Sequence, residues 1–300
     1  MLGLTILGNN SALPAFGRNP TAQILQTDHD MMLIDCGEGT QLQMSKFKIK
    51  RNRLKYIFIS HLHGDHYFGL VGLLTSMGLA NRTDDIHIYA PPMLKEIIEL
   101  QLTVADTRLP YTIYYHSLEK ESVITETQTL TVSCFKVHHR IECFGFLFKE
   151  KKMKRSIDPT RAQSYEVPPD FYEQLQNGMD YITKKGTIIP NDQVTIDAPR
   201  AASYAYCADT LYHDELVAKV KDVDVLYYET TYLNDMSVKA VARFHSTTVQ
   251  AGEMAKKAGV KKLLIGHFSS KYETLDQFLS ETSEVFQNTE LALEGTCYRI

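Results

Sequence analysis

The chain lacks the features that would place it outside the cell or in a membrane. It has only five cysteines in 300 residues, and none of them forms a Cys-x-x-Cys pair. The odd number argues against a disulfide framework and for a reducing compartment. No secretory signal and no run of 18 apolar residues occurs in the sequence, so we expect a soluble, cytoplasmic protein with no membrane partner.

A strong charge of one sign is also missing. The 32 basic and 36 acidic residues give a formal net charge of −4, so a polyanionic partner would have to bind local basic patches. Hydrophobic residues make up 44% of the chain, which excludes a disordered protein and predicts a sizeable core. We expect a single domain over residues 1–300, because α/β folds often reach this length as one unit.

Short apolar segments predict a fold of mixed class. LKYIFIS, residues 54–60, is nearly continuous and suits a strand that is buried on both faces. Strand-like segments alternate with helical patterns in both halves of the chain, and there is no repeat of 20 to 50 residues. This order predicts an α/β protein, an αββα sandwich of two mixed sheets flanked by helices. The other expected strands cover residues 2–8, 21–27, 31–35, 85–90, 111–118, 130–137, 143–150, 201–209 and 224–232, and helices are expected at 213–221, 247–258 and 274–287.

The segment after Glu150 has a different composition. Residues 151–200 are polar and rich in proline and glycine, with one short helical candidate near 169–177. We interpret this segment as an insertion that protrudes from the core.

The segment FISHLHGDHYFG, residues 58–69, carries three histidines and an aspartate at the exit of the expected buried strand. His61 and His63 can point at one ion, while Asp65 and His66 lie around the bend and can reach a second. Two neighbouring ions clamp a phosphodiester and lower the pKa of a shared water. The alternative, ordinary core or surface histidines, does not explain four ligand-type residues in six positions.

The motif His61-Leu62-His63-Gly64-Asp65-His66 resembles the signature of the metallo-β-lactamase superfamily, and nearly the whole chain is similar to its short-form ribonuclease Z branch. In that family a ligand histidine precedes a glycine by six positions, which selects His139 rather than His138. The segment YCADT resembles the Gly-Asp-Thr turn and implies that Asp209 bridges both ions, although Ala208 replaces the usual glycine. The segment LLIGHFSSKY implies that His267 completes the second site.

The resemblance therefore implies two metal sites. His61, His63, His139 and Asp209 would hold one ion, and Asp65, His66, Asp209 and His267 the other. Mixed nitrogen and oxygen ligands suit two Zn²⁺ ions, and Mn²⁺ is the alternative. Asp65 would also orient or deprotonate the attacking water, and Asp35 would fix a ligand imidazole through a hydrogen bond.

Further motifs imply an RNA substrate. YYETTY and FHSTT stand where the family carries Glu-Ala-Thr and His-Ser-Thr, which gives His245 the role of proton donor and Glu229 that of orienting it. The first loop keeps Pro14, Arg18 and Asn19 of the family pattern, but Phe16 replaces a common lysine and could stack on a base. The three expected substrate contacts of this loop are Phe16, Arg18 and Asn19.

The insertion at 151–200 stands where the family has its flexible tRNA-binding arm, although Asp170-Phe171 replaces the family's Gly-Pro. Its cations could contact phosphates of a tRNA, and those at its start are Lys151, Lys152, Lys154 and Arg155. A solvated charged hairpin is the alternative. A second basic run, KFKIKRNRLK at 46–55, fits either an RNA contact or a helix C-terminus, and both interpretations stay open.

Together with the motifs, the resemblance implies a zinc-dependent endoribonuclease that removes the 3′ trailer of precursor tRNA and acts as a homodimer. One alternative is a phosphodiesterase of the same superfamily that acts on another RNA or on small diesters. Another is a catalytically silent RNA-binding or metal-sensing protein, which the complete ligand set disfavours.

Overall fold

The structure is a computed structural model that describes residues 2–198 and 200–300. Residue 1 of the predicted domain and residue 199 of the predicted insertion lie outside the described residues. The described chain forms two compact units, one running to Lys149 and resuming from Ala202 to Ile300, the other comprising Glu150–Ala201. Each unit has a hydrophobic core of its own.

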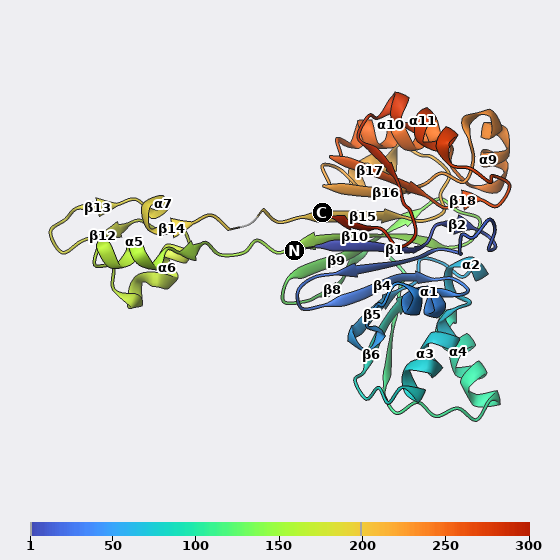
Figure 1. Ribbon diagram of the computed structural model, residues 1–300, viewed down its shortest axis with the longest axis horizontal. Helices are drawn as coiled ribbons and strands as arrows, with labels where there is room; N and C mark the ends of the chain where they lie inside the picture. The colour runs from blue at the N-terminus through green and yellow to red at the C-terminus, as the bar shows by residue number, and fades with distance from the viewer. Residues whose placement is uncertain (1, 199) are drawn as a thin grey trace. The chain divides into compact units, whose positions relative to one another are not determined.

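The larger unit is built on two seven-stranded sheets (Figure 1). From β4 to β7 the strands of the first sheet are parallel, whereas β20, β1, β3 and β4 pair antiparallel in that order. This sheet is therefore mixed. In sheet order its strands are β20 (Cys297–Arg299), β1 (Gly3–Gly8), β3 (Ala22–Gln26), β4 (Met31–Cys36), β5 (Leu54–Phe58), β6 (Ile86–Ala90) and β7 (Ile113–Ser117).

The second sheet is mixed as well. Its strands are, in sheet order, β19 (Thr289–Leu291), β17 (Lys262–Gly266), β16 (Val225–Glu229), β15 (Ser203–Cys207), β10 (Cys143–Glu150), β9 (Leu130–Val137) and β8 (Ser122–Glu126). β15, β16, β17 and β19 are parallel, while β10 pairs antiparallel with β15 and β8 with β9.

Strand β4 shows why its sequence is apolar throughout. Successive side chains of a strand point to opposite faces of the sheet. Met32 and Ile34 therefore pack into the core between the sheets, while Met31 and Leu33 pack into the core under the helices of the first sheet. A strand that is buried on both faces cannot alternate apolar with polar residues.

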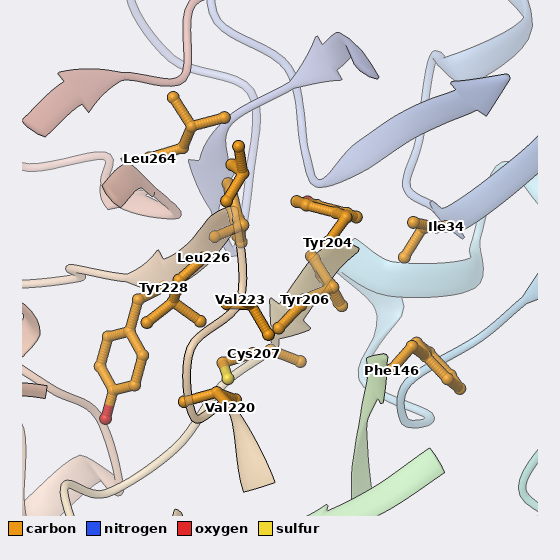
Figure 2. Packing of buried hydrophobic residues seen from close by; sticks show 14 of the residues in the cluster. Ile34, Phe146, Tyr204, Tyr206, Cys207, Val220, Val223, Leu226, Tyr228 and Leu264 are labelled. Carbon is orange, nitrogen blue, oxygen red and sulfur yellow. The ribbon is translucent and has the colours of Figure 1, made fainter. Parts of the chain in front are cut away.

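Aromatic rings from both sheets fill the space between them. The Phe58 ring of the first sheet lies 5.5 Å from the Phe146 ring and 5.4 Å from the Phe148 ring of the second, measured between centroids. Figure 2 shows Ile34 in the same cluster as Phe146 and Tyr204. This shared core holds the two sheets together, and with them the strand ends that carry the site.

Helices cover the outer faces of both sheets (Figure 1). On the first sheet lie α1 (Thr40–Lys46), α3 (Leu70–Leu79) and α4 (Met93–Val104), and on the second lie α10 (Thr248–Ala258) and α11 (Asp276–Val285). The predicted αββα sandwich is thereby confirmed. Helices α3 and α4 and strand β8 were absent from the prediction.

Short elements complete this unit. They are β2 (Asn10–Ser11), which pairs with β18 (Phe268–Ser269), α2 (Gly64–Tyr67), α8 (Glu215–Lys219), α9 (Ser237–Arg243), and the 3-10 turns η1 (Arg51–Arg53) and η3 (Asn234–Met236).

The smaller unit is organised around a core of five buried residues: Ala162, Val167, Leu175, Ile189 and Val194. Its elements are β11 (Ser156–Ile157), α5 (Pro159–Ser164), η2 (Pro169–Phe171), α6 (Tyr172–Gln176), β12 (Tyr181–Ile182), β13 (Ile188–Ile189), α7 (Asn191–Val194) and β14 (Thr195–Ile196). One helical segment was expected near 169–177, but the structure has two further helices, α5 before it and α7 after it. Helix α5 begins after Asp158, whose side chain accepts a hydrogen bond from the Arg161 amide, and Pro159 is its first residue.

The structure also describes the cysteines and the character of the helices. All five cysteines are free, and four of them are buried, which agrees with the predicted lack of a disulfide framework. Within the described residues, no helix combines the length and the apolar character that a membrane crossing requires.

Candidate active site

The predicted metal ligands gather where strands of both sheets end. His61 follows β5, His139 follows β9, Asp209 follows β15 and His267 follows β17, each within three residues of the strand. Asp65 and His66 lie on α2, the short helix that begins after His63. Ligand sites of α/β proteins form at the carboxyl ends of strands, because the loops there converge on one edge.

The first group consists of three imidazoles and a carboxylate whose ligand atoms all lie within 4.8 Å of one another: His61, His63, His139 and Asp209. Nδ1 of His63 lies 2.9 Å from Nε2 of His61 and 3.1 Å from Nε2 of His139. Oδ2 of Asp209 lies 3.7 Å from Nε2 of His61. Burial keeps the pKa of His61 well below its ordinary value and lowers that of His63 to about 4, so both offer neutral nitrogens.

The second group shares Asp209 through its other oxygen. Oδ1 of Asp209 lies 3.0 Å from Nε2 of His267 and 3.4 Å from Nε2 of His66. Oδ2 of Asp65 lies 3.4 Å from Nε2 of His267 and 3.5 Å from Nε2 of His66. Asp209 therefore stands between the two groups and presents one carboxylate oxygen to each.

These residues fit a pair of cations. Three buried atoms of the second group have no hydrogen-bond partner among the described residues: Nε2 of His66, Nε2 of His267 and Oδ1 of Asp209. Leaving a buried polar atom unpaired costs about 1–3 kcal/mol. Lone pairs that face one another in this way are satisfied by a metal ion, and the mixed imidazole and carboxylate donors match metal chemistry.

Hydrogen bonds from surrounding residues hold the ligand rings. Asp35 Oδ2 lies 2.8 Å from Nδ1 of His66, and Asp35 also accepts from the Ser60 amide at 2.7 Å and from the Tyr206 hydroxyl at 2.5 Å. Nδ1 of His267 lies 2.9 Å from the Thr231 hydroxyl. With the Nδ1 atoms engaged, the Nε2 atoms of His66 and His267 are directed at Asp209.

The backbone is strained at the same place. Asp35, Phe244 and His267 have left-handed φ angles of 54°, 59° and 61°. Residues other than glycine rarely adopt this backbone conformation, so the surrounding structure must stabilise it. At Phe244 the result is a carbonyl that lies 3.0 Å from Nδ1 of His139. Ala208, in contrast, is not among the described residues with positive φ, so the turn before Asp209 tolerates its Cβ.

His245 and Glu229 form a charged pair beside the two groups. Nδ1 of His245 lies 2.8 Å from Oε1 of Glu229 and 4.0 Å from Oδ2 of Asp209. Burial works to lower the pKa of His245, but the Glu229 carboxylate outweighs it and raises the pKa to about 9. The imidazole is therefore protonated at neutral pH, as a proton donor requires.

A cavity of about 590 Å³ opens over the two groups. This volume suits a nucleotide-sized ligand. Its wall includes three residues described above, Asp65, Asp209 and His245. It also includes three cationic side chains: Arg140, Lys239 and Arg243.

The three residues of the first loop expected to contact substrate do not line this cavity. Arg18 donates to the carbonyls of Tyr272 and Glu273 and to Oδ1 of Asn10. Asn19 is held by Glu294 through its amide and its side chain. Phe16 is 55% exposed and lies under the Arg18 guanidinium. Arg18 and Asn19 therefore hold the loop in place through hydrogen bonds. Of the three residues, Phe16 is the one whose side chain is open to contact by a ligand.

The expected arm contacts lie in the smaller unit. Lys152 and Arg155 line a cavity of about 660 Å³ there. Lys154 pairs with Glu173 at 3.1 Å, and Arg155 bonds to Thr195 and Asp197. Lys151 is half-buried in the same stretch.

Several site residues escaped the sequence analysis. Ser60 donates to Asp35 at 2.9 Å and lies 3.0 Å from Nδ1 of His61. Thr231 joins Glu229 and His267, and Arg140 donates to Nε2 of His63 at 2.9 Å. Ser60 lies in the segment FISHLHGDHYFG, and Thr231 lies in YYETTY. Their positions inside these motifs were the signal by which they could have been found.

His138 lies apart from the two groups. Its ring stacks on that of His213 with a centroid distance of 3.9 Å and an interplanar angle of 16°. Nearly parallel rings cannot direct their in-plane lone pairs at one ion, so this pair does not make a third site with Glu215. Of the two adjacent histidines, only His139 joins the first group.

Curated relatives match the whole chain. The ribonuclease Z of Bacteroides thetaiotaomicron is 40% identical over 299 residues, covering 99% of this chain and 95% of that protein. The ribonuclease Z of Cytophaga hutchinsonii is 40% identical over 304 residues, covering 99% of this chain and 96% of that protein.

A family model matches part of the chain, and solved structures share its fold. The model described as anti-Pycsar protein Apyc1 matches residues 2–188. The human tRNase Z, short form, superposes with a TM-score of 0.73 at 25% identity and covers 99% of both chains. The metallo-β-lactamase fold protein YhfI of Bacillus subtilis superposes with a TM-score of 0.70 at 17% identity, covering 99% of this chain and 98% of its own.

Proposed function

We propose that this chain, which belongs to the ribonuclease Z family and, over residues 2–188, to the family described as anti-Pycsar protein Apyc1, is a metal-dependent endoribonuclease that removes the 3′ trailer of precursor tRNA. The observation that carries the proposal is Asp209 standing between two ligand groups, with the His245–Glu229 pair beside it. The names of the relatives support tRNA as the substrate.

The proposed cofactors are two Zn²⁺ ions, with Mn²⁺ as the alternative. His61, His63, His139 and Asp209 would hold the first, and Asp65, His66, His267 and Asp209 the second. Ions bound there supply Lewis-acid stabilisation of the phosphate and lower the pKa of water.

The chain's own residues divide the rest of the chemistry. Asp65, whose Oδ2 also accepts from the Ala12 amide at 2.8 Å, orients the attacking water and takes its proton. His245 delivers a proton to the departing 3′-oxygen of the tRNA, and Glu229 keeps the imidazole charged and oriented. The phosphate remains on the trailer, and the tRNA ends in a 3′-hydroxyl.

The smaller unit is proposed to be the tRNA-binding arm. Lys152 and Arg155 face one cavity of this unit, and Lys151 and Lys154 add positive charge to the same stretch. Phosphate contacts of this kind position a nucleic acid without reading its sequence.

The protein is proposed to act in the cytoplasm as a homodimer. Leu100 and Val104, one turn apart on α4, are 63% and 77% exposed and offer an apolar surface to a second subunit. Light scattering of the purified protein measures the subunit number directly.

The deciding experiment compares a precursor tRNA with an unstructured RNA of equal length. The proposal predicts one cut after the discriminator nucleotide of the precursor, a 3′-hydroxyl on the tRNA and slow, unspecific cutting of the control. Equal rates on both RNAs would instead favour a general phosphodiesterase of the same superfamily. Precursors with and without an encoded CCA end then show how the enzyme treats that end.

A further inference from the structure

The cavity wall carries three cations that have no carboxylate partner. Lys239 and Arg243 are one turn apart on α9, both are exposed, and Arg140 reaches the cavity from the loop after β9. Among the described residues, none of the three forms an ion pair. Like charges one turn apart destabilise a helix slightly, so their position calls for a ligand that offsets the repulsion.

Charge around the cavity points to an anion. The carboxylates of the wall are Asp65 and Asp209, which face the two ligand groups, and Glu38 from the loop after β4. The whole chain is acidic, with a net charge of −4, so three unpaired cations on one wall are a local feature. Arginine and lysine side chains around a nucleotide-sized cavity favour phosphate.

Arg140 is held by His63 in a way that metal binding changes. Its guanidinium donates to Nε2 of His63, while Nδ1 of His63 faces His61 and His139. A metal on Nδ1 requires the proton of the neutral ring to sit on Nε2, where it can no longer accept a hydrogen bond. With a metal bound there, the Arg140 guanidinium would lose this acceptor and could donate to a ligand in the cavity that it already lines.

The positions of these cations relative to His245 indicate which side of the scissile bond they contact. Arg243 precedes His245 by two residues, and its α9 neighbour Lys239 lies 5.4 Å over the Tyr232 ring on the same wall. His245 must reach the 3′-oxygen that leaves with the tRNA. The nucleotide on the 5′ side of the cut therefore lies against α9.

We propose that Arg140, Lys239 and Arg243 form a phosphate-binding subsite that holds the RNA backbone on the tRNA side of the scissile bond. This inference rests on the proposed function and names the part of the substrate that the cavity wall binds. The subsite is independent of sequence, because phosphates are common to all tRNAs.

The test measures binding of the reaction product, a tRNA that ends at the cleavage site, to the zinc-loaded protein by fluorescence anisotropy. The double variant Lys239→Gln/Arg243→Gln is expected to weaken this binding about tenfold at low salt. It should also flatten the slope of log Kd against log salt concentration by about two, roughly one for each lost phosphate contact. The charge-conserving variant Lys239→Arg/Arg243→Lys should keep the wild-type slope.

The matched control is Lys221→Gln/Lys256→Gln, which removes the same charge from two exposed lysines outside the cavity wall. Equal affinity and equal slope in the double variant and this control would overturn the subsite. Weaker binding of a 5′-phosphorylated trailer, with unchanged binding of the tRNA product, would overturn its orientation. If the wild type fails to cut precursor tRNA at all, the proposed function falls instead.

Discussion

Glu229 holds Nδ1 of His245 at 2.8 Å from its Oε1 atom. The carboxylate is fully buried, while the imidazole side chain is 14% exposed and reaches the cavity. Oε2 of Glu229 accepts hydrogen bonds from the amide and hydroxyl of Thr231, and Oε1 also accepts from the amide of Ser246. A charge held by this many donors cannot turn away from the imidazole, so the proton donor is fixed in both orientation and protonation state.

The pH dependence of cleavage follows from this pair. The pKa of His245 is raised to about 9, and the protonated ring is the donor, so activity is present below that pKa and falls as pH rises through it. Glu229→Gln removes the charge that raises the pKa and should move the alkaline limb of kcat/KM to lower pH. His245→Ala should reduce cleavage about 100-fold or more at pH 7. An alkaline limb that stays in place in Glu229→Gln would contradict the assignment of the donor.

The loss of Asp209 should lower the metal content more than the loss of any other ligand, because Asp209 faces both groups. Asp209→Ala should reduce the bound metal from two ions per chain to one or fewer. Cleavage should fall at least about 100-fold, since even residues outside the ligand shell cost about 10–100-fold when removed. Metal analysis of the purified variant by mass spectrometry checks the ion count, and a cleavage assay on precursor tRNA checks the rate.

His138→Ala is the control for that experiment. His138 neighbours a ligand in sequence but stacks on His213, so its removal should leave the metal content unchanged. Loss of metal in this variant would show that the wrong member of the His138–His139 pair has been placed in the site.

Gly145 explains in physical terms why a glycine follows the ligand histidine by six positions. A Cβ at Gly145 would lie 2.3 Å from the Phe135 ring and 2.9 Å from the Tyr206 carbonyl. Gly145→Ala should therefore lower the free energy of unfolding by about 1–3 kcal/mol, as overpacking of a core does.

The matched control is Gly72→Ala on helix α3, where the added Cβ meets nothing closer than 3.9 Å. It should be neutral or raise the free energy of unfolding by about 0.5–1 kcal/mol, because alanine favours a helix. Urea denaturation of both variants gives the comparison, and equal losses in both would refute the packing argument.

The elements that the sequence predicted well have strong local signals. Residues 130–137 and 143–150 were predicted as strands and form β9 and β10 at those bounds. Their apolar side chains are visible in the sequence. Helix α3 was not predicted, since no side chain caps its start at Gly69. Helix α4 was missed although Pro91 and Pro92 mark its start.

Relationships across the fold could not be predicted in this way. The clamp of Arg18 on the carbonyls of Tyr272 and Glu273 joins segments about 250 positions apart, and nothing local marks it. The left-handed backbone of Phe244 and His267 is equally hidden, because a positive φ is uncommon for any residue other than glycine and no local signal marks these two positions. The motif residues indicated which side chains do the chemistry, and the tertiary contacts determine how they are held.

The role of the smaller unit can be tested by removing it. Lys149 and Ser203 are paired residues on β10 and β15, so a short glycine-containing turn can replace residues 150–201 without changing the sheet. The shortened protein should keep its metal content, because all the ligands lie in the larger unit. Its KM for precursor tRNA should rise at least about tenfold at physiological salt, since several phosphate contacts are lost. Lys151→Gln/Lys152→Gln in the full chain should raise KM in the same direction by a smaller factor. A KM that is unchanged by the deletion would show that the unit is a solvated appendage and that the cavity of the larger unit binds the substrate alone.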